Sequence, residues 1–517
     1  MKGNGLQQRG ERRIAAALRI ALVVLLLALQ ITLVVLLAYL LRQYAAIVYA
    51  ILQATGLVAA IGIYNRRGDA LYKFSWIILI LTVPVVGLIL FLLWGQGAAR
   101  RRLLRSFQRP CEEPESIRMR GELNADRLAR AMPIWARLSA SLRSRGFPVY
   151  QNTEAVYFSE GRTFLEDLLK KCEAAERFIF LEYFILAEGQ VWERLRAVLC
   201  ERARAGVEVK IIFDDFGNIK RFRGETIAEL REAGVEVEVF NPVHRYVNRL
   251  YFNYRDHRKI ACVDGDFAWT GGVNVGDEYA NLVARFGYWK DSGVRLEGEG
   301  AWGLTSAFLD MWRSLSGEPH HERDYYRPHA DVRAEGWCQV FTDGPLNGTD
   351  NPAEDAYLQL IGNARRFLYI TTPYFIPDSE TLHALCIAGD GGVDVRLMLP
   401  AVPDHRYTDV VAESYFGELL EHGVKIYRYT PGFLHQKCVM VDREVAMIGS
   451  VNMDYRSFQL HFECAALLYG SPVVEHLLED LDAVVQQSHA VTAEEWRRRK
   501  WYRRLAEPIL RIFAIWM

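Results

Sequence analysis

The chain has no excess of charge of either sign. Its 517 residues carry 62 Lys and Arg against 63 Asp and Glu, which gives a formal net charge of −1. Proteins that bind nucleic acid usually show a basic excess that steers them to the phosphate backbone. We therefore expect no nucleic-acid partner, and the balance counts against a nuclease.

Paired cysteines and metal-ligand motifs are also missing. The chain has 8 Cys, but none of them form the close pairs of a secreted disulfide framework. It contains neither an HExxH nor a CxxC motif. We therefore expect no metal ion and no other cofactor in the site, and a catalytic domain on the cytoplasmic face.

Long apolar runs are confined to the N-terminal part. Residues 20–41, 44–64 and 75–94 are long enough to span a bilayer, so we expect residues 1–102 to form a membrane-anchoring region with two or three spans. Basic residues precede the first run and follow the last one, and such flanks favour the cytoplasm. Three crossings would place the two basic flanks on opposite sides of the membrane, so only one of them could lie in the cytoplasm. Either 44–64 is interfacial or re-entrant, or one basic cluster lies on the unexpected side.

One catalytic pattern occurs twice in the rest of the chain. The sequence HxKxxxxD, with an Asn 17 residues after the His, gives a first copy of His257, Lys259, Asp264 and Asn274 and a second copy of His435, Lys437, Asp442 and Asn452. A Gly also follows each His by 14 residues. Five positions preserved twice indicate a functional pattern and not a coincidence of composition.

These residue types suit chemistry at phosphorus. One neutral imidazole can attack phosphorus, a second can protonate the departing alkoxide, and two ammonium groups can neutralise the phosphoryl oxygens. Residues i and i+2 of a strand share a face, so the His and Lys of each copy can point into one pocket. Asp264 and Asp442 fall seven residues after the His. That odd offset points them to the opposite face, where we expect a structural role within the catalytic motif.

The duplicated HxKxxxxD pattern resembles the phospholipase D superfamily. The N-terminal apolar runs and the stretch at 494–499 further resemble bacterial cardiolipin synthase. The resemblance implies that His257 is the nucleophile that forms a phosphohistidine and that His435 is the general acid and base, although the two copies are equivalent in sequence. Lys259, Lys437, Asn274 and Asn452 would bind the phosphoryl oxygens. Asp291 and Glu463, one downstream of each motif, would accept a hydrogen bond that orients an imidazole.

Other segments repeat together with the motifs at a period of about 180 residues. Strands that alternate with helices predict α/β architecture, with two fused phospholipase D-like α-β-α sandwich domains in a pseudo-two-fold arrangement after the transmembrane helices. We place these domains at 149–335 and 336–490. A basic linker at 103–148 precedes them, and a basic amphipathic element at 491–517 follows them. We expect this element to lie on anionic membrane, and the alternative is a helix that docks on the catalytic domain.

The function most consistent with this resemblance is a cardiolipin synthase that transfers a phosphatidyl group from one phosphatidylglycerol to another and releases glycerol. The alternatives are a membrane-anchored phospholipase D or nuclease that uses water as the acceptor, and a lipid-binding scaffold without activity. The expected partners are phosphatidylglycerol and anionic membrane lipid. The basic and aromatic residues of 244–255 suit a lipid headgroup, and the alternatives for this stretch are a nucleic-acid stacking groove and an ordinary loop between a helix and a strand. The expected location is the bacterial plasma membrane, with several spans.

Overall fold

The computed structural model describes residues 25, 26, 28–36, 39, 44–66, 70–95, 115–219, 221, 222, 224–242, 253–317, 323–345 and 351–512. The chain divides into two compact units. The helical unit comprises Met1–Gln108, Asn241–Tyr254 and Ile515–Met517, and the α/β unit comprises Arg109–Phe240 and Arg255–Ala514. Part of the predicted span 20–41, the basic residues at 100–105 and most of 244–255 lie outside the described residues.

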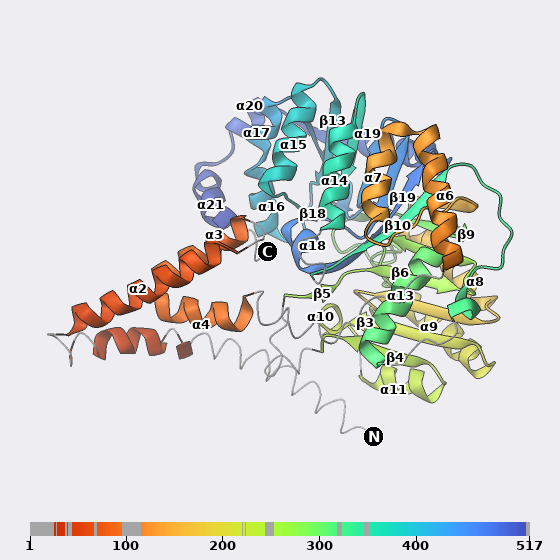
Figure 1. The fold of residues 1–517 in the computed structure, drawn as a ribbon, viewed down its shortest axis with the longest axis horizontal. Coiled ribbons are helices and arrows are strands. Elements are labelled where there is room, and N and C mark those ends of the chain that lie inside the picture. The colour runs from red at the N-terminus through yellow and green to blue at the C-terminus, as the bar shows by residue number, and fades with distance from the viewer. Residues whose placement is uncertain are drawn as a thin grey trace. The chain divides into compact units, whose positions relative to one another are not determined.

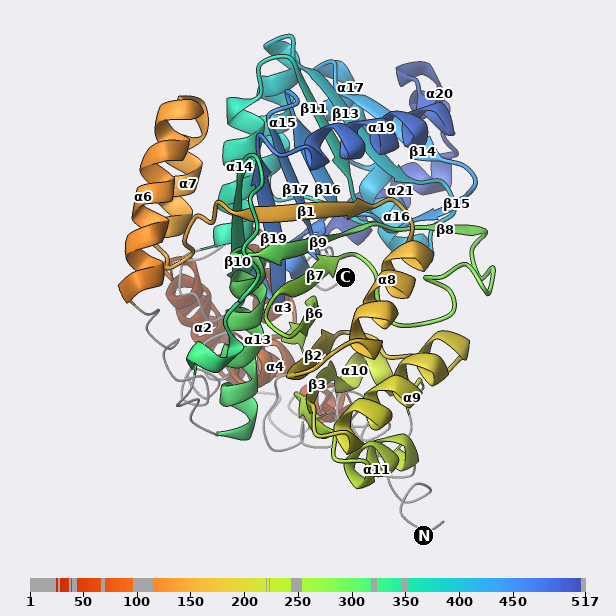
Figure 2. The same cartoon turned by 90° about the vertical axis from the view of Figure 1, so that its right-hand side faces the viewer.

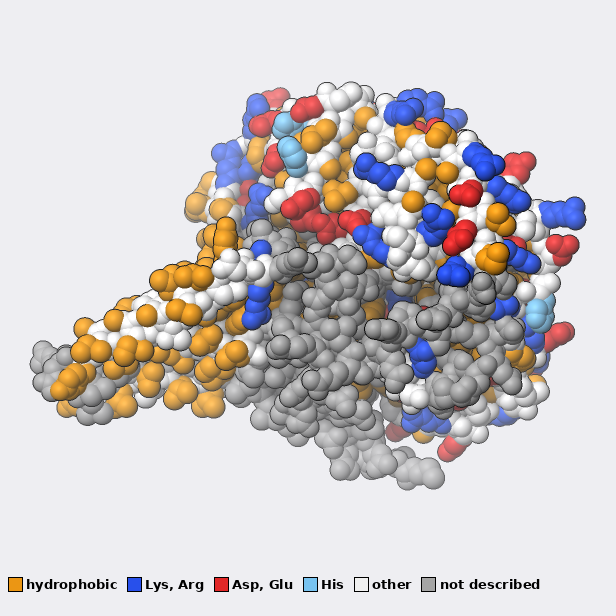
Figure 3. Space-filling view, in the orientation of Figure 1, with side chains coloured by type: hydrophobic (Ala, Val, Ile, Leu, Met, Phe, Trp, Pro, Cys, Tyr) orange, Lys and Arg blue, Asp and Glu red, His pale blue; other side chains and the backbone are white. Residues whose placement is uncertain are grey.

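The helical unit contains α2 (Ala45–Tyr64), α3 (Ala70–Thr82) and α4 (Pro84–Trp94). Among the described residues, one helix, Ala46–Tyr64, is long and apolar enough to cross a membrane. Its exposed side chains include Ile51, Leu57 and Val58, and Figure 3 shows apolar side chains along its surface. A helix that is apolar on its outer surface is typical of a lipid environment.

The predicted span 75–94 is wrong as a single helix. The helix breaks at Val83, which has φ −132° and ψ 72°, and Pro84 begins the next helix. α4 then folds back along α3, so that the rings of Trp76 and Phe91 lie 5.3 Å apart. A Cβ on Gly87 would lie 2.7 Å from the Cα of Ile80, which shows that this close approach requires glycine. The apolar run forms a helical hairpin.

The first half of the α/β unit is built on a seven-stranded sheet. Its strands, in spatial order, are β1 (Thr153–Phe158), β9 (Gly293–Gly298), β7 (Phe267–Gly271), β6 (Lys259–Val263), β2 (Phe178–Tyr183), β3 (Glu208–Asp214) and β4 (Glu236–Phe240). β2, β3 and β4 run parallel, and the other pairs are antiparallel. Every residue of β2 and β6 is buried, as expected for strands covered on both faces.

The second half repeats this order. Its sheet is formed by β10 (Trp337–Asp343), β19 (His461–Tyr469), β17 (Val445–Gly449), β16 (Cys438–Val441), β11 (Phe367–Thr371), β13 (Asp394–Pro400), β14 (Lys425–Tyr429) and β20 (Ser488–Val491). β6 and β16 occupy equivalent positions, each antiparallel to the strand that begins the parallel part of its sheet. The mixed α/β architecture and the internal duplication are those predicted from the sequence.

Helices cover both faces of each sheet (Figures 1 and 2). In the first half these are α8 (Gly161–Glu173), α9 (Gln190–Arg204), α11 (Gly224–Glu232) and α13 (Ala301–Ser316). In the second half they are α14 (Pro352–Asn363), α15 (Ser379–Asp390), α16 (Arg406–Glu413), α17 (Phe416–Glu421) and α19 (Val473–Gln486). Figure 2 shows α13 on one side of the first sheet and α8 and α9 on the other.

The predicted basic linker is helical where it is described. α6 (Glu115–Ala131) and α7 (Ala136–Arg143) precede the first sheet. The backbone oxygens of Ser139 and Phe147 accept hydrogen bonds from Gln339, so this segment is attached to the second half. The C-terminal element forms α20 (Ala493–Arg497) and α21 (Trp501–Ile512).

Candidate active site

Two short strands connect the halves of the α/β unit directly in front of the predicted histidines. β5 (Arg255–Asp256) of the first half pairs with β19 of the second, and β15 (Gly432–Leu434) of the second half pairs with β8 (Tyr288–Lys290) of the first. The backbone N–H of His257 donates to the oxygen of Phe462 at 2.9 Å, and that of His435 donates to Lys290 at 2.7 Å. Each histidine is therefore fixed against the opposite half.

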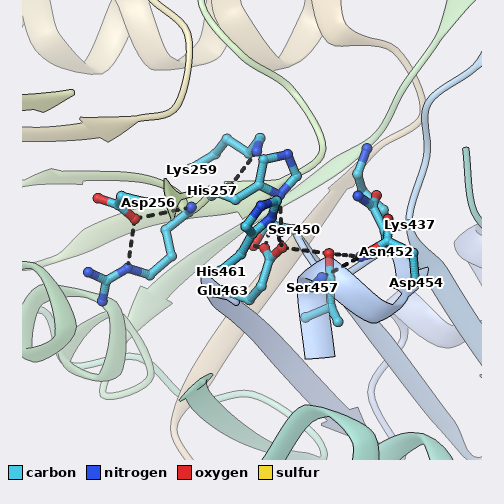
Figure 4. Close-up of polar contacts among 12 residues, drawn as sticks. Asp256, His257, Lys259, Lys437, Ser450, Asn452, Asp454, Ser457, His461 and Glu463 are labelled. Carbon is cyan, nitrogen blue, oxygen red and sulfur yellow. Dashed lines mark hydrogen bonds and ion pairs between the residues drawn. The ribbon is translucent and has the colours of Figure 1, made fainter. Parts of the chain in front are cut away.

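The imidazoles and the predicted carboxylates pair crosswise. Nδ1 of His257 lies 2.9 Å from Oε1 of Glu463, and Nδ1 of His435 lies 2.6 Å from Oδ2 of Asp291. Figure 4 shows His257 beside Glu463 and His461, with Lys437 and Asn452 nearby. An acceptor at Nδ1 holds the proton on that nitrogen and leaves Nε2 free to attack or to exchange a proton.

Burial and neighbouring cations keep both imidazoles neutral. Burial lowers the pKa of His257 well below its usual value, and the charges of Lys259 and Lys437 lower it further. Burial also lowers the pKa of His435, to about 4, despite the opposing effect of Asp291. The lysines of both motifs thus affect the pKa of each histidine, which shows that the two motifs share one site. Neutral imidazole is the form that can act as a nucleophile or base.

The two motif lysines are buried and point back along their own strands. Nζ of Lys259 donates to the oxygen of His257, and Nζ of Lys437 donates to the oxygen of His435. Burial lowers the pKa of Lys259 to about 8 and that of Lys437 to about 7. An anionic group in the site would stabilise both ammonium forms.

The two motif asparagines differ in their contacts. Oδ1 of Asn274 accepts from the backbone of Ile185 at 3.1 Å, and its Nδ2 donates to the hydroxyl of Tyr279 at 2.9 Å. Oδ1 of Asn452 is buried without a hydrogen-bond partner in the described part of the chain. Phosphoryl binding by either amide stays a prediction.

The residue after the motif glycine is Gly272 in the first copy and Ser450 in the second. The carboxylate beside each position explains this difference. A Cβ on Gly272 would lie 2.1 Å from Oδ1 of Asp291, so only glycine leaves room for that carboxylate. Ser450, at the equivalent position, donates its hydroxyl to Glu463. Ser457 donates to the same carboxylate at 2.7 Å. Both serines hold Glu463, a role that the sequence interpretation did not assign to either of them.

The motif aspartates face away from the histidines. Asp264 accepts from the backbone N–H groups of Glu176, Arg177 and Phe178 at 2.7–2.9 Å, at the start of β2. Asp442 accepts in the same way from Arg365, Arg366 and Phe367, at the start of β11. Both aspartates adopt positive φ, at 54° and 53°. Their position fits the structural role expected from their odd offset.

Two further groups beside His257 were not indicated by any sequence pattern. The ring of His461 lies 5.5 Å from that of His257, and its buried Nδ1 lies 3.7 Å from Oε1 of Glu463. Neither nitrogen of His461 makes a hydrogen bond to another described residue. Arg456 lies on α18 (Tyr455–Gln459), and its Nε is also buried, with no hydrogen bond in the part of the chain that the structure describes. Its charge lowers the pKa of both histidines. Buried polar groups usually have partners, so these groups are available to a ligand.

Among the described residues, one group of side chains has the spacing to hold a metal ion. Ligand atoms of His257, His461 and Glu463 lie within 4.8 Å of one another. The hydrogen bond between His257 and Glu463 already accounts for two of these three residues. The positive charges of Lys259 and Lys437 also disfavour the binding of a metal cation beside them. Metal independence stays a prediction.

Comparison with known proteins identifies the family. Residues 165–283 and 357–485 match the model described as "Cardiolipin synthase, PLD-like domain", and residues 56–96 match "Phospholipase_D-nuclease N-terminal". The major cardiolipin synthase ClsA of Bacillus subtilis is 34% identical over 89% of this chain and 96% of its own length. The chain belongs to the PLD-like cardiolipin synthase family.

Other relatives agree with this membership. A cardiolipin synthase of Halalkalibacterium halodurans is 33% identical over 85% of this chain and 88% of its own length. The crystal structure of phosphatidylserine synthase from Haemophilus influenzae is similar in fold, with a TM-score of 0.55 and 16% identity, over 73% of this chain and 96% of that one. The architecture of two phospholipase D-like domains is therefore shared.

The pKa values of the lysines predict how substrate binding depends on pH. Lys437 loses its proton above a pH of about 7 and Lys259 above about 8, so the affinity for an anionic phosphodiester should fall as pH rises through this range. Lys437→Arg keeps its charge, so this variant should lose the part of the decrease that begins near pH 7. The measurement is KM from about pH 6 to about pH 9. The same profile in both proteins would contradict the role of Lys437.

Proposed function

We propose that this chain is a cardiolipin synthase, which transfers a phosphatidyl group from one phosphatidylglycerol to another and releases glycerol. The proposal rests chiefly on the two crossed imidazole–carboxylate pairs, His257 with Glu463 and His435 with Asp291, in a member of the PLD-like cardiolipin synthase family. A two-step transfer requires one neutral, oriented imidazole as the nucleophile and a second oriented imidazole that gains and loses a proton as acid and base.

In the first step, Nε2 of His257 attacks the phosphorus of phosphatidylglycerol. The bond from phosphorus to the glycerol headgroup breaks. His435 enters this step as an imidazolium, which Asp291 and the bound phosphodiester anion stabilise, and it donates its Nε2 proton to the departing alkoxide. Lys259 and Lys437 neutralise the charge that builds up on the phosphoryl oxygens. The products of this step are free glycerol and a phosphatidyl group on His257.

In the second step, the headgroup hydroxyl of another phosphatidylglycerol attacks the same phosphorus. His435 removes the proton from this hydroxyl, the bond between phosphorus and nitrogen breaks, and cardiolipin leaves. The nitrogens of His461 and the guanidinium of Arg456 supply hydrogen-bonding and cationic groups for polar headgroups on this side of the site. With water as the acceptor, the same steps would yield phosphatidic acid.

Incubation of the detergent-solubilised protein with phosphatidylglycerol and a chelator tests this function. We expect cardiolipin and glycerol in equal amounts. His257→Ala and His435→Ala should each lower the rate by about 1000-fold or more, because each variant lacks a group that takes part in both steps. The readouts are the separated lipid products and free glycerol.

His422→Ala is the matched control, since His422 pairs with Asp390 at the surface and should not affect the rate. Phosphatidic acid as the main product would identify a hydrolase. Substantial cardiolipin formation by either active-site variant would contradict the two-histidine mechanism.

We also propose a membrane topology with two crossings. α3 and α4 have 13 and 11 residues. At about 1.5 Å per residue they are about 20 and 16 Å long, shorter than a hydrocarbon core of about 30 Å. As a hairpin they enter and leave on one side, so the run 20–41 and α2 make an even number of crossings. The N-terminus, the loop after α2 and the basic cluster at 100–105 then all face the cytoplasm, together with the α/β unit.

Labelling with a membrane-impermeant maleimide tests this topology. In a Cys111→Ser background, Asn65→Cys and Ala99→Cys should react only after the cells are permeabilised, whereas Gln43→Cys should react in intact spheroplasts. The seven described native cysteines are buried and should not contribute. Reaction of Ala99→Cys, but not of Asn65→Cys, in intact spheroplasts would indicate three crossings and exclude the hairpin.

A further inference from the structure

The C-terminal helix α21 is attached to the α/β unit through its charged side. Arg503 forms an ion pair of 2.5 Å with Glu413 of α16, and the guanidinium of Arg511 lies 4.2 Å from the ring of Tyr415. Arg499 holds Glu507 through two hydrogen bonds of 2.6 and 2.8 Å. Glu507 is buried, so this side of the helix faces protein.

The outward side of α21 is apolar. Trp501, Leu505 and Ile509 follow one another at intervals of four residues and are 72%, 60% and 59% exposed. Residues four apart lie on the same face of a helix, so these side chains form one stripe. Surface helices of soluble proteins show the opposite arrangement, with the apolar stripe inward and the charges outward. Exposure of this apolar stripe to water is unfavourable, so we expect an apolar surface to cover it.

Exposed basic side chains lie at the N-terminal end of this stripe and beside Leu505. Arg497, Arg498, Lys500 and Arg504 are exposed on α21 and on the segment that leads into it. Tyr502, half exposed, adds a second aromatic ring beside Trp501. Aromatic residues suit the boundary between headgroups and acyl chains, and Lys and Arg next to them attract anionic lipid phosphates. The composition fits an anionic bilayer better than an apolar protein groove.

We propose that the exposed face of α21 binds the surface of an anionic bilayer, with Trp501, Leu505 and Ile509 inserted at the level of the acyl-chain boundary. This surface goes beyond the proposed function, although phosphatidylglycerol would be both the substrate and the anionic lipid that is bound. It supplies a second attachment to the membrane besides α2, at the opposite end of the chain.

The bound surface is linked to the active site by packed elements. α21 packs on α16, and α16 packs on β12 (Phe375–Ile376). β12 pairs in parallel with β18 (Met453–Asp454), which directly follows Asn452 of the second motif. Attachment of α21 to the bilayer would therefore hold the second motif at a fixed height above the lipid headgroups.

A fluorescent reporter in the full-length protein tests the contact. In the Cys111→Ser background, Leu505→Cys carries an environment-sensitive nitrobenzoxadiazole group, and the protein is reconstituted in nanodiscs. We expect a blue-shifted emission that is larger with phosphatidylglycerol than with phosphatidylcholine alone. Ala493→Cys, exposed on α20, is the control site and should show no shift. No shift at residue 505 would overturn the proposal. A shift that depends on protein density and not on lipid charge would also overturn it, because it would indicate that a second copy of the chain covers the stripe.

Activity supplies the second readout. Trp501→Asp combined with Leu505→Asp should lower turnover of bilayer phosphatidylglycerol by about tenfold and leave turnover of monomeric dihexanoyl phosphatidylglycerol unchanged. Ile387→Asp, which replaces another exposed apolar side chain on α15, should change neither rate. An equal decrease on both substrates would contradict a membrane-binding role. Failure of the wild-type protein to form cardiolipin would refute the proposed function but would not affect the fluorescence result.

Discussion

Two hydrogen bonds that cross between the halves of the α/β unit determine where its chemistry can take place. They join His257 to Glu463 at 2.9 Å and His435 to Asp291 at 2.6 Å. The pairing of β5 with β19 and of β15 with β8 places these groups opposite each other. Neither half alone contains a motif imidazole together with the carboxylate that orients it. The duplicated motif therefore depends on the association of the two duplicated domains, and any change that separates the halves should remove both pairs together.

The two motifs are equivalent in sequence but not in their surroundings. His435 lies among aromatic rings, with Trp289 at 5.3 Å and Tyr279 at 5.7 Å. His257 has the edge of Phe184 at 5.1 Å on one side and the polar groups of His461 and Arg456 nearby. Burial keeps both imidazoles neutral. The differences in their neighbours give a physical basis for different roles in a two-step reaction.

The duplicated motif and the α/β class could be recognised from the sequence, because period and spacing are local properties. The sequence placed Asp291 and Glu463 after their motifs but could not show which imidazole each would meet, since that depends on pairing between strands far apart in the chain. Residues 75–94 read as one apolar run because composition does not record the break at Val83 or the close approach at Gly87. Arg456 and His461 are not part of the repeated motif, so their place in the site follows only from the packing of the folded chain.

Trapping of the covalent intermediate tests the central claim most directly. In His435→Ala, a phosphatidyl p-nitrophenyl ester needs no acid for its leaving group, so the first step can proceed while the second lacks its base. The account predicts release of p-nitrophenolate in a burst close to one equivalent and, by mass spectrometry under alkaline conditions, a phosphatidyl group on His257. A modified residue other than His257, or rapid turnover without an intermediate, would contradict it.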